Sequence, residues 1–279
     1  MRSINQDPHT FDGELFARIA GSRNRIPSES RREAWIADTV LLLASKLGND
    51  AVLSGGGAVR NITHVMRATY DVDFDVRIGS LQEIRRKLKD VNQAIGIKRI
   101  ESGKIGALHE NPKRNVEKTF YGMRKMLHML RRTDQGDLRV HLMHVPEMPE
   151  MFVDPPRVEL VSIEQTDSYV LNARPEHLFF RKALRAITER RVEDFLDTYN
   201  LFHTAGASGR NQIITYARSK DAAAVSRGIK ILAGEPEHFK KELAFRLAYA
   251  EADLSPARMK ALAHLVAAEL SKTANAISD

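Results

Sequence analysis

The sequence contains no cysteine, which excludes disulfide bonds and metal sites built from thiolates. It also lacks a long apolar run, because no stretch approaches the ~20 apolar residues that a membrane-spanning helix needs. Residues 1–16 contain no hydrophobic segment of the kind that signal peptides carry. These absences predict a cytoplasmic protein without a membrane-embedded part.

Several signatures of nucleotide and metal enzymes are also missing. No Gly-Lys-Ser/Thr follows the glycines at 55–57, so they do not form a Walker A motif, and the G-x-G-x-x-G spacing of dinucleotide sites is absent. The ten histidines are scattered, and no H-x-x-x-H or H-x-H pair lies beside the aspartates. A histidine-based metal hydrolase is therefore disfavoured.

The composition is that of a globular protein with a basic balance. Of the 279 residues, 43% are hydrophobic and 28% are charged, which is ordinary for a chain that folds around its own core. The net charge of +7 favours polyanionic partners such as nucleotides or nucleic acid. Mild basicity without any such partner is the alternative.

The spacing of apolar residues predicts two regions of different architecture. The expected helices of the first region cover 31–47, 58–66 and 81–95, with Ser30 and Ser80 as caps, and its expected strands cover 51–54, 70–78, 97–100, 118–126, 138–145 and 158–163. From about residue 175 helical periodicity dominates, with breaks at 204–209, 234–236 and 255–256. We therefore predict an α+β chain with a mixed-sheet domain at 1–173 and an all-helical domain at 174–279.

The segment 70–78 carries three aspartates on alternate residues. Because strand side chains alternate between faces, Asp71, Asp73 and Asp75 share one face. Neighbouring Cα atoms on that face are ~7 Å apart, so two carboxylates can hold one divalent ion. Mg²⁺ (or Mn²⁺) suits them, since Mg²⁺ binds through one or two carboxylates plus substrate phosphates. Asp71 and Asp73 are the predicted metal ligands and Asp75 is a further candidate; a solvated strand face is the alternative.

Gly55, Gly56 and Gly57 follow an apolar strand and open a helix. Glycines let backbone N–H groups approach a phosphate, and a helix N-terminus adds a favourable partial charge. A glycine triplet alone is more often a plain turn. Followed by the aspartate strand, it predicts a site for a nucleoside triphosphate bound with a metal ion.

The segments 53–59 (LSGGGAV) and 67–74 (RATYDVDF) resemble the polymerase-beta-like nucleotidyltransferases, and within them the AbiEii/AbiGii toxin group. The pattern of that group is a Gly-Gly-Thr-Ala-Leu turn followed by Arg-x-Thr-x-Asp-Ile-Asp-Phe. Gly57 stands where the group usually has Thr or Ser, and Ser54 is the hydroxyl that could replace it. The resemblance implies that Ser54, the glycines and Arg67 contact the nucleotide.

A second match lies downstream, in the segments 176–186 (EHLFFRKALRA) and 190–197 (RRVEDFLD). They resemble the Lys-x-x-Ala-x-x-x-Arg-x-x-x-Asp-x-x-Asp-Leu helix pair of the same group, so the resemblance covers roughly residues 50–205. It implies that Lys182 and Asp194 are catalytic, with Arg191 and Asp197 nearby. A solvated helix face with core residues behind it is the alternative.

The resemblance implies a Mg²⁺-dependent enzyme that moves a nucleoside monophosphate from a nucleoside triphosphate to an acceptor. It further implies the toxin of a toxin–antitoxin pair with a role in phage defence, an antitoxin protein as partner, and RNA, such as a tRNA 3′ end, as acceptor. Arg60, Arg67, Arg77, Arg131 and Arg132 are candidate phosphate contacts. A small-molecule or protein hydroxyl as acceptor is one alternative, and a non-catalytic nucleotide-binding module is another.

One departure from the family pattern concerns the third carboxylate, which these enzymes usually carry on a neighbouring strand. The expected strand at 138–145 has no acid within it, and His141 occupies the place where we would look for one. A histidine there could take a proton from an attacking hydroxyl, or it could be an ordinary strand residue. Asp75 and Asp137 are the other candidates.

Overall fold

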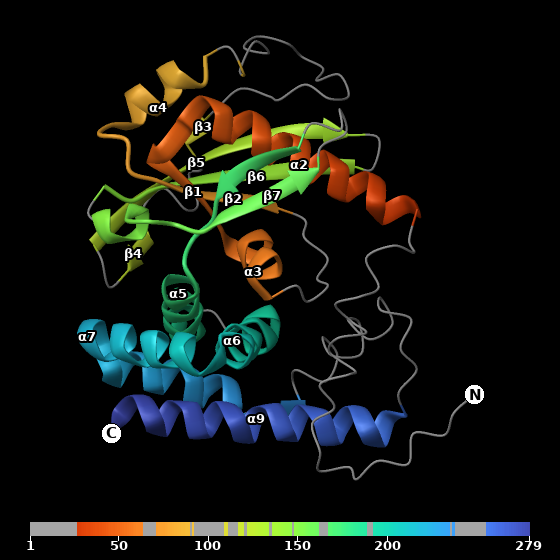
Figure 1. Cartoon of the computed structure of the whole chain (residues 1–279), viewed down its shortest axis with the longest axis vertical. Coiled ribbons are helices and arrows are strands. Elements are labelled where there is room, and N and C mark those ends of the chain that lie inside the picture. The colour runs from red at the N-terminus through yellow and green to blue at the C-terminus, as the bar shows by residue number, and fades with distance from the viewer. Residues whose placement is uncertain are drawn as a thin grey trace. The chain divides into compact units, whose positions relative to one another are not determined.

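The computed structural model describes residues 27–63, 71–89, 91, 109–110, 117–119, 122–133, 136–146, 148–161, 167–188, 192–234, 236–237 and 255–279. They form two compact units, shown in Figure 1. The sheet unit has its described residues within 27–61 and 71–174, and the helical unit comprises 175–279 with Ile62 and Thr63. Within the described ranges, no helix has the length and apolar character needed to cross a membrane.

A mixed sheet with strand order β1-β2-β6-β5-β3 forms the centre of the sheet unit. Its strands are β1 (Ala51–Ser54), β2 (Asp71–Val76), β3 (His109–Glu110), β4 (Glu117–Thr119), β5 (Gly122–Thr133) and β6 (Gly136–His144). β2 and β6 are parallel, whereas β1–β2, β5–β6, β3–β5 and β4–β5 are antiparallel pairs. A separate hairpin pairs β7 (Arg157–Val161) with β8 (Asp167–Leu171).

The helices of this unit are α2 (Pro27–Leu47), α3 (Gly55–Thr63) and α4 (Leu81–Lys87), with short 3₁₀ turns η2 (Gly48–Asp50) and η3 (Pro149–Phe152). The buried residues of α2 recur at helical spacing: Ile36, Val40, Leu43 and Leu47. Ser80 caps α4 as expected, because its hydroxyl accepts a hydrogen bond from the Glu83 amide at 3.1 Å.

The helix α2 covers the apolar face of the sheet. Register partners across strands point to the same face, so Phe74 lies beside Leu142 and Leu127 in one buried row. Arg131 shares that face and is 5% exposed. Its guanidinium pairs with Asp38 of α2 at 2.6 Å. The aspartates of β2 therefore point to the opposite face.

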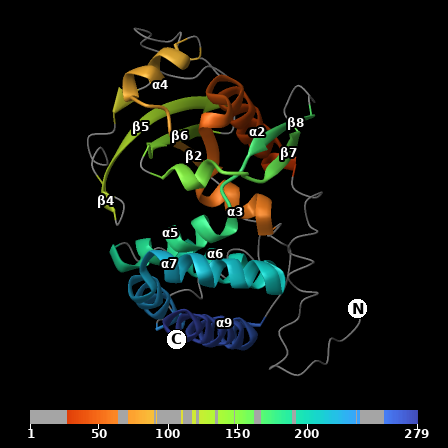
Figure 2. The same cartoon turned by 60° about the vertical axis from the view of Figure 1, so that its left-hand side comes forward.

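The helical unit consists of α5 (Pro175–Thr188), α6 (Val192–Thr204), α7 (Gly206–Ala233) and α9 (Pro256–Ser278). Figure 2 shows α7 between α5 and α9. A Cβ added to Gly228 of α7 would lie 1.9 Å from the Ala183 carbonyl oxygen, so α5 and α7 approach each other too closely there for any other residue. Asp221 interrupts α7 with extended backbone angles, and its carboxylate accepts from the Ala224 amide at 2.9 Å.

The predicted fold class is confirmed: a mixed sheet with helices is followed by an all-helical region. The expected strands at 51–54, 70–78, 138–145 and 158–163 are present as β1, β2, β6 and β7. The separation of 1–173 and 174–279 into independently folding domains stays a prediction.

Several expected elements differ from the structure. Ser30 lies inside α2, which begins at Pro27, because proline at the first helical position loses no helical hydrogen bond. The helix expected at 58–66 begins at Gly55, so the glycines form its first turn instead of a loop before it. The strand expected at 118–126 is divided between β4 and β5, and β8 had no counterpart among the expected strands. The expected strand at 97–100 lies outside the described residues.

Candidate active site

The three aspartates of β2 differ in their access to solvent. Asp71 and Asp73 are partly exposed, whereas Asp75 is 0% exposed. The apolar residues between them are buried, so the predicted alternation holds along the strand. Asp75 lies deepest, beside Val52 of β1 and Met143 of β6. The structure thus sets Asp71 and Asp73 apart as the two carboxylates of this face that meet solvent.

The carboxylate of Asp73 packs directly on the first residue of α3. Gly55 has a φ of +64°, and a Cβ built there would lie 2.0 Å from Oδ2 and 2.7 Å from Cγ of Asp73. Only glycine combines that backbone angle with such a close approach. The glycine at this position is therefore required by the neighbouring carboxylate as well as by the turn.

The other oxygen of Asp73 contacts His141, its register partner on β6. Nδ1 of His141 lies 3.0 Å from Oδ1 of Asp73, so the tautomer with hydrogen on Nδ1 donates to the carboxylate. His128 of β5 stands next in the same row, with its ring centroid 5.4 Å from that of His141. His141 is thus part of the acidic cluster, and its further role in proton transfer stays a prediction.

The remaining residues of the glycine turn are less constrained. A Cβ on Gly57 would meet only Leu53 Cδ2, at the ordinary contact distance of 4.0 Å. The Thr or Ser of the resembled pattern would therefore fit here without displacing backbone. Ser54 is buried at the end of β1, as the register partner of Asp73.

The donor set of this face fits a divalent cation. Two partly exposed carboxylates, at positions i and i+2 of one strand, are hard oxygen ligands of the kind that Mg²⁺ uses together with phosphates. Among the described residues, no three His, Asp or Glu side chains group into a complete metal site. Two carboxylates leave the remaining positions around such an ion to phosphates and water.

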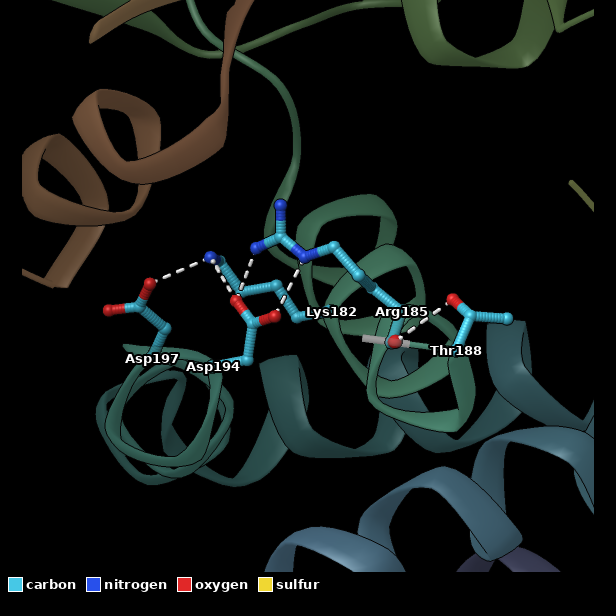
Figure 3. A network of polar contacts seen from close by, with 5 residues as sticks. All are labelled: Lys182, Arg185, Thr188, Asp194 and Asp197. Carbon is cyan, nitrogen blue, oxygen red and sulfur yellow. Dashed lines mark hydrogen bonds and ion pairs between the residues drawn. The ribbon is translucent and has the colours of Figure 1, made fainter. Parts of the chain in front are cut away.

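The helical unit carries a second, buried charge cluster. Lys182 of α5 is 4% exposed, and its Nζ lies 3.0 Å from Oδ1 of Asp194 and 2.7 Å from Oδ2 of Asp197. Both carboxylates belong to α6 and are 0% exposed. Figure 3 shows Lys182 between them. The family resemblance implied that Lys182, Asp194 and Asp197 lie near one another, and in the structure they are in contact.

Arg185 completes this cluster. Its Nε donates to Oδ2 of Asp194 at 2.7 Å, and a terminal nitrogen of the same guanidinium contacts Oδ1 (Figure 3). The side chain is 33% exposed, unlike those of its partners. Arg185 was not among the site residues predicted from the sequence. Its position three residues after Lys182 was the signal, because residues at i and i+3 share a helix face.

The charges of the cluster set the ionisation of Asp194. Burial acts to raise the pKa of this carboxyl, but Lys182 and Arg185 outweigh burial, so the pKa of Asp194 lies below its ordinary value. The carboxylate is therefore charged at neutral pH. Two cations and two anions balance one another, which limits the cost of burying them.

The arginines proposed as phosphate contacts divide into distinct groups. Arg131 is buried against α2 and paired with Asp38. Arg77 pairs with Asp50 at 3.1 Å, and Arg132 with Asp137 at 3.4 Å. Arg60 is partly exposed on α3. The predicted site residues Arg67 and Arg191 lie outside the described residues.

No family model and no curated protein matches the sequence. Among solved structures, JHP933 from Helicobacter pylori is similar, with 12% identity, a TM-score of 0.41, and coverage of 86% of this chain and 93% of that chain. A candidate nucleotidyltransferase from H. pylori is similar with 13% identity, a TM-score of 0.41, and coverage of 87% and 96%. Likeness at this level carries no functional argument.

Proposed function

We propose that the protein is a Mg²⁺-dependent nucleotidyltransferase of the polymerase-beta-like type. The observation that supports the proposal is the position of the Asp73 carboxylate, which lies between Gly55, the first residue of α3, and His141. A carboxylate held against the N-terminal turn of a helix places a metal ligand beside backbone N–H groups that favour phosphate. A strand face that merely carried charge would not need a glycine beneath one of its carboxylates.

In the proposed reaction, an acceptor hydroxyl oxygen bonds to the α-phosphorus of a nucleoside triphosphate. The bond from that phosphorus to the bridging oxygen breaks and pyrophosphate leaves, while the hydroxyl proton passes to a base, for which His141 is the candidate. Asp71 and Asp73 would hold Mg²⁺, which supplies positive charge to the phosphate oxygens when it is bound. The amides of Gly55, Gly56 and Gly57 would orient the phosphates.

Lys182 and Asp194 are proposed as further catalytic residues. An ammonium neutralises charge that develops on a departing pyrophosphate. The ammonium of Lys182 contacts Asp194 and Asp197, so in this proposal it would exchange one of these carboxylates for a phosphate oxygen. Asp194 would thereby set the position of the lysine, and Arg185 fixes Asp194 in turn.

For the acceptor we propose RNA, with a tRNA 3′ end as the first candidate. The net charge of +7 supports a polyanionic acceptor. The motif resemblance to the AbiEii/AbiGii group supports the same choice. The resemblance also supports a role as the toxin of a toxin–antitoxin pair active in phage defence, with an antitoxin protein as partner.

The test is transfer of label from each nucleoside triphosphate, labelled at the α-phosphate, to total cellular RNA with Mg²⁺ or Mn²⁺ present. Wild-type protein should label RNA, and the double variant Asp71→Asn/Asp73→Asn should not. Glu83→Gln is the control, because this carboxylate pairs with Arg86 on α4 and belongs to no proposed site. If Asp71→Asn/Asp73→Asn transfers label at the wild-type rate, the site assignment is wrong.

A second candidate function is a nucleotide-binding module without catalysis. The observation in its favour is that His141 stands beside Asp73 where related enzymes carry a third carboxylate. Isothermal titration with each triphosphate separates the two functions. Mg²⁺-dependent binding without transfer to RNA, small molecules or protein hydroxyls would support the module.

A further inference from the structure

The helical unit contains a shallow depression between the second half of α7 and the end of α9. Its volume is about 500 Å³, and it is lined by Ala223, Ser226, Arg227, Lys230, Ile231 and Ser278. The Ser278 hydroxyl donates to the Ser226 hydroxyl at 2.7 Å, and Arg218 donates to the Ala276 carbonyl at 2.5 Å. These contacts join α7 to α9, so the walls of the depression are fixed relative to each other.

The helix that lines this depression is strongly basic. From Gly206 to Ala233 it carries five basic residues (Arg210, Arg218, Lys220, Arg227 and Lys230) and a single acid, Asp221. The carboxylate of Asp221 is engaged with the Ala224 amide. Among the buried residues of α7 there is no cation, so its positive charge lies toward solvent.

Arg227 and Lys230 differ from other exposed cations of the unit. Both are exposed, and neither side chain makes a hydrogen bond or an ion pair with any described residue. By contrast, Lys260 pairs with Glu237 at 3.6 Å and Lys272 with Glu269 at 2.6 Å. Arg227 and Lys230 are also three residues apart on one helix, so both can reach a ligand seated in the depression.

We propose that this depression, with Arg227 and Lys230 at its rim, is a docking surface for the phosphate backbone of RNA. The inference rests on the proposed function, since it concerns how an RNA acceptor is held away from the reacting end. Arg, Lys and Ser are the side chains that contact phosphate and sugar without reading sequence. A protein partner fits less well, because specific protein interfaces bury roughly 800 Å² per partner, whereas this depression is shallow and carries Arg227 and Lys230 at its rim.

The test is binding of a fluorescently labelled RNA hairpin with a single-stranded 3′ end, followed by anisotropy over a series of salt concentrations without nucleotide. The plot of the logarithm of the association constant against the logarithm of salt concentration has a negative slope. Arg227→Gln/Lys230→Gln should make this slope less steep by about 1.4 to 1.8, since each lost phosphate contact contributes roughly 0.7 to 0.9. If the affinities converge at about 1 M salt, this corresponds to about 25- to 60-fold weaker binding at about 0.1 M salt.

The matched control is Lys260→Gln/Lys272→Gln, which removes the same charge from cations that are already paired. It should leave the slope unchanged. An equal loss in both double variants would show a general charge effect and overturn the docking surface, as would an unchanged slope in Arg227→Gln/Lys230→Gln. Displacement of RNA by polyglutamate at equal charge concentration would also overturn it, in favour of an acidic protein partner.

Failure of this proposal is distinguishable from failure of the proposed function. If label transfer depends on Asp71 and Asp73 but Arg227→Gln/Lys230→Gln keeps the wild-type salt dependence of RNA binding, the docking surface alone is wrong. If that variant has a weaker salt dependence but the wild-type protein transfers no label to RNA, the enzyme assignment alone is wrong. Both substituted side chains are exposed, so thermal unfolding should match wild type.

Discussion

Replacing Gly55 by alanine is expected to displace the Asp73 carboxylate, whereas replacing Gly57 is not. Both glycines lie in the first turn of α3, so the two variants alter the same helix by the same methyl group. At Gly55 the new Cβ would lie 2.0 Å from Oδ2 of Asp73, while at Gly57 it would meet only Leu53, at 4.0 Å. The pair therefore isolates the contact between the glycine turn and the aspartate strand.

Two contributions set the size of the effect. A non-glycine residue at the positive φ of Gly55 costs about 1–2 kcal/mol, and forcing a side chain into a filled space costs about 1–3 kcal/mol more. Gly55→Ala should thus lower the free energy of unfolding by about 2–5 kcal/mol. Gly57→Ala should leave it unchanged or raise it by about 0.5–1 kcal/mol, because alanine favours helix.

Urea denaturation of the whole chain measures the stability of each variant, and labelled-nucleotide transfer measures its activity. A carboxylate moved by about 1 Å can lower turnover about 100-fold, so Gly55→Ala should lose transfer while Gly57→Ala keeps it. Adding Asp73→Ala to Gly55→Ala removes the contacts with Oδ2 and Cγ. The double variant should therefore be more stable than the sum of the two single effects.

Equal urea midpoints for Gly55→Ala and Gly57→Ala would refute the reasoning. Additive stabilities in the Gly55→Ala/Asp73→Ala cycle would refute it as well, because they would show that the two side chains do not meet. The cycle remains informative if Gly55→Ala folds poorly, since the double variant is expected to recover part of the lost stability.

Two further predictions concern the buried charge cluster. Lys182→Met should lower the free energy of unfolding by about 3–5 kcal/mol, because it leaves Asp194 and Asp197 buried with one fewer cation. Adding Asp197→Asn to Lys182→Met should restore part of this loss. A urea midpoint of Lys182→Met close to that of wild type would contradict the prediction. Because the folded-state pKa of Asp194 is lowered, its contribution to stability is present above the ordinary aspartate pKa of about 3.9 and is lost as pH falls through the folded-state value. Urea midpoints measured as a function of pH should fall less steeply on the acid side for Asp194→Asn than for wild type, and parallel acid limbs would show that Asp194 is not the linked group.

The sequence by itself determined the local features of the site. Strict alternation at 71–76 placed the carboxylates on one strand face, since side-chain direction follows from the two-residue period alone. The three-residue interval from Asp194 to Asp197 placed both carboxylates on one helix face, since helical spacing decides which side chains share a face. These are properties of a few consecutive residues, and they need no knowledge of distant pairing.

Only the tertiary structure decided which distant residues meet. The parallel register of β2 and β6 places His141 at Asp73, and a shift of one residue would have turned that side chain to the other face. Burial of Lys182 and Arg131 likewise depends on helices packed from elsewhere in the chain. The glycine at position 55 was predicted as a phosphate turn, but its contact with Asp73 follows from the pairing of β1 with β2, which no local pattern specifies.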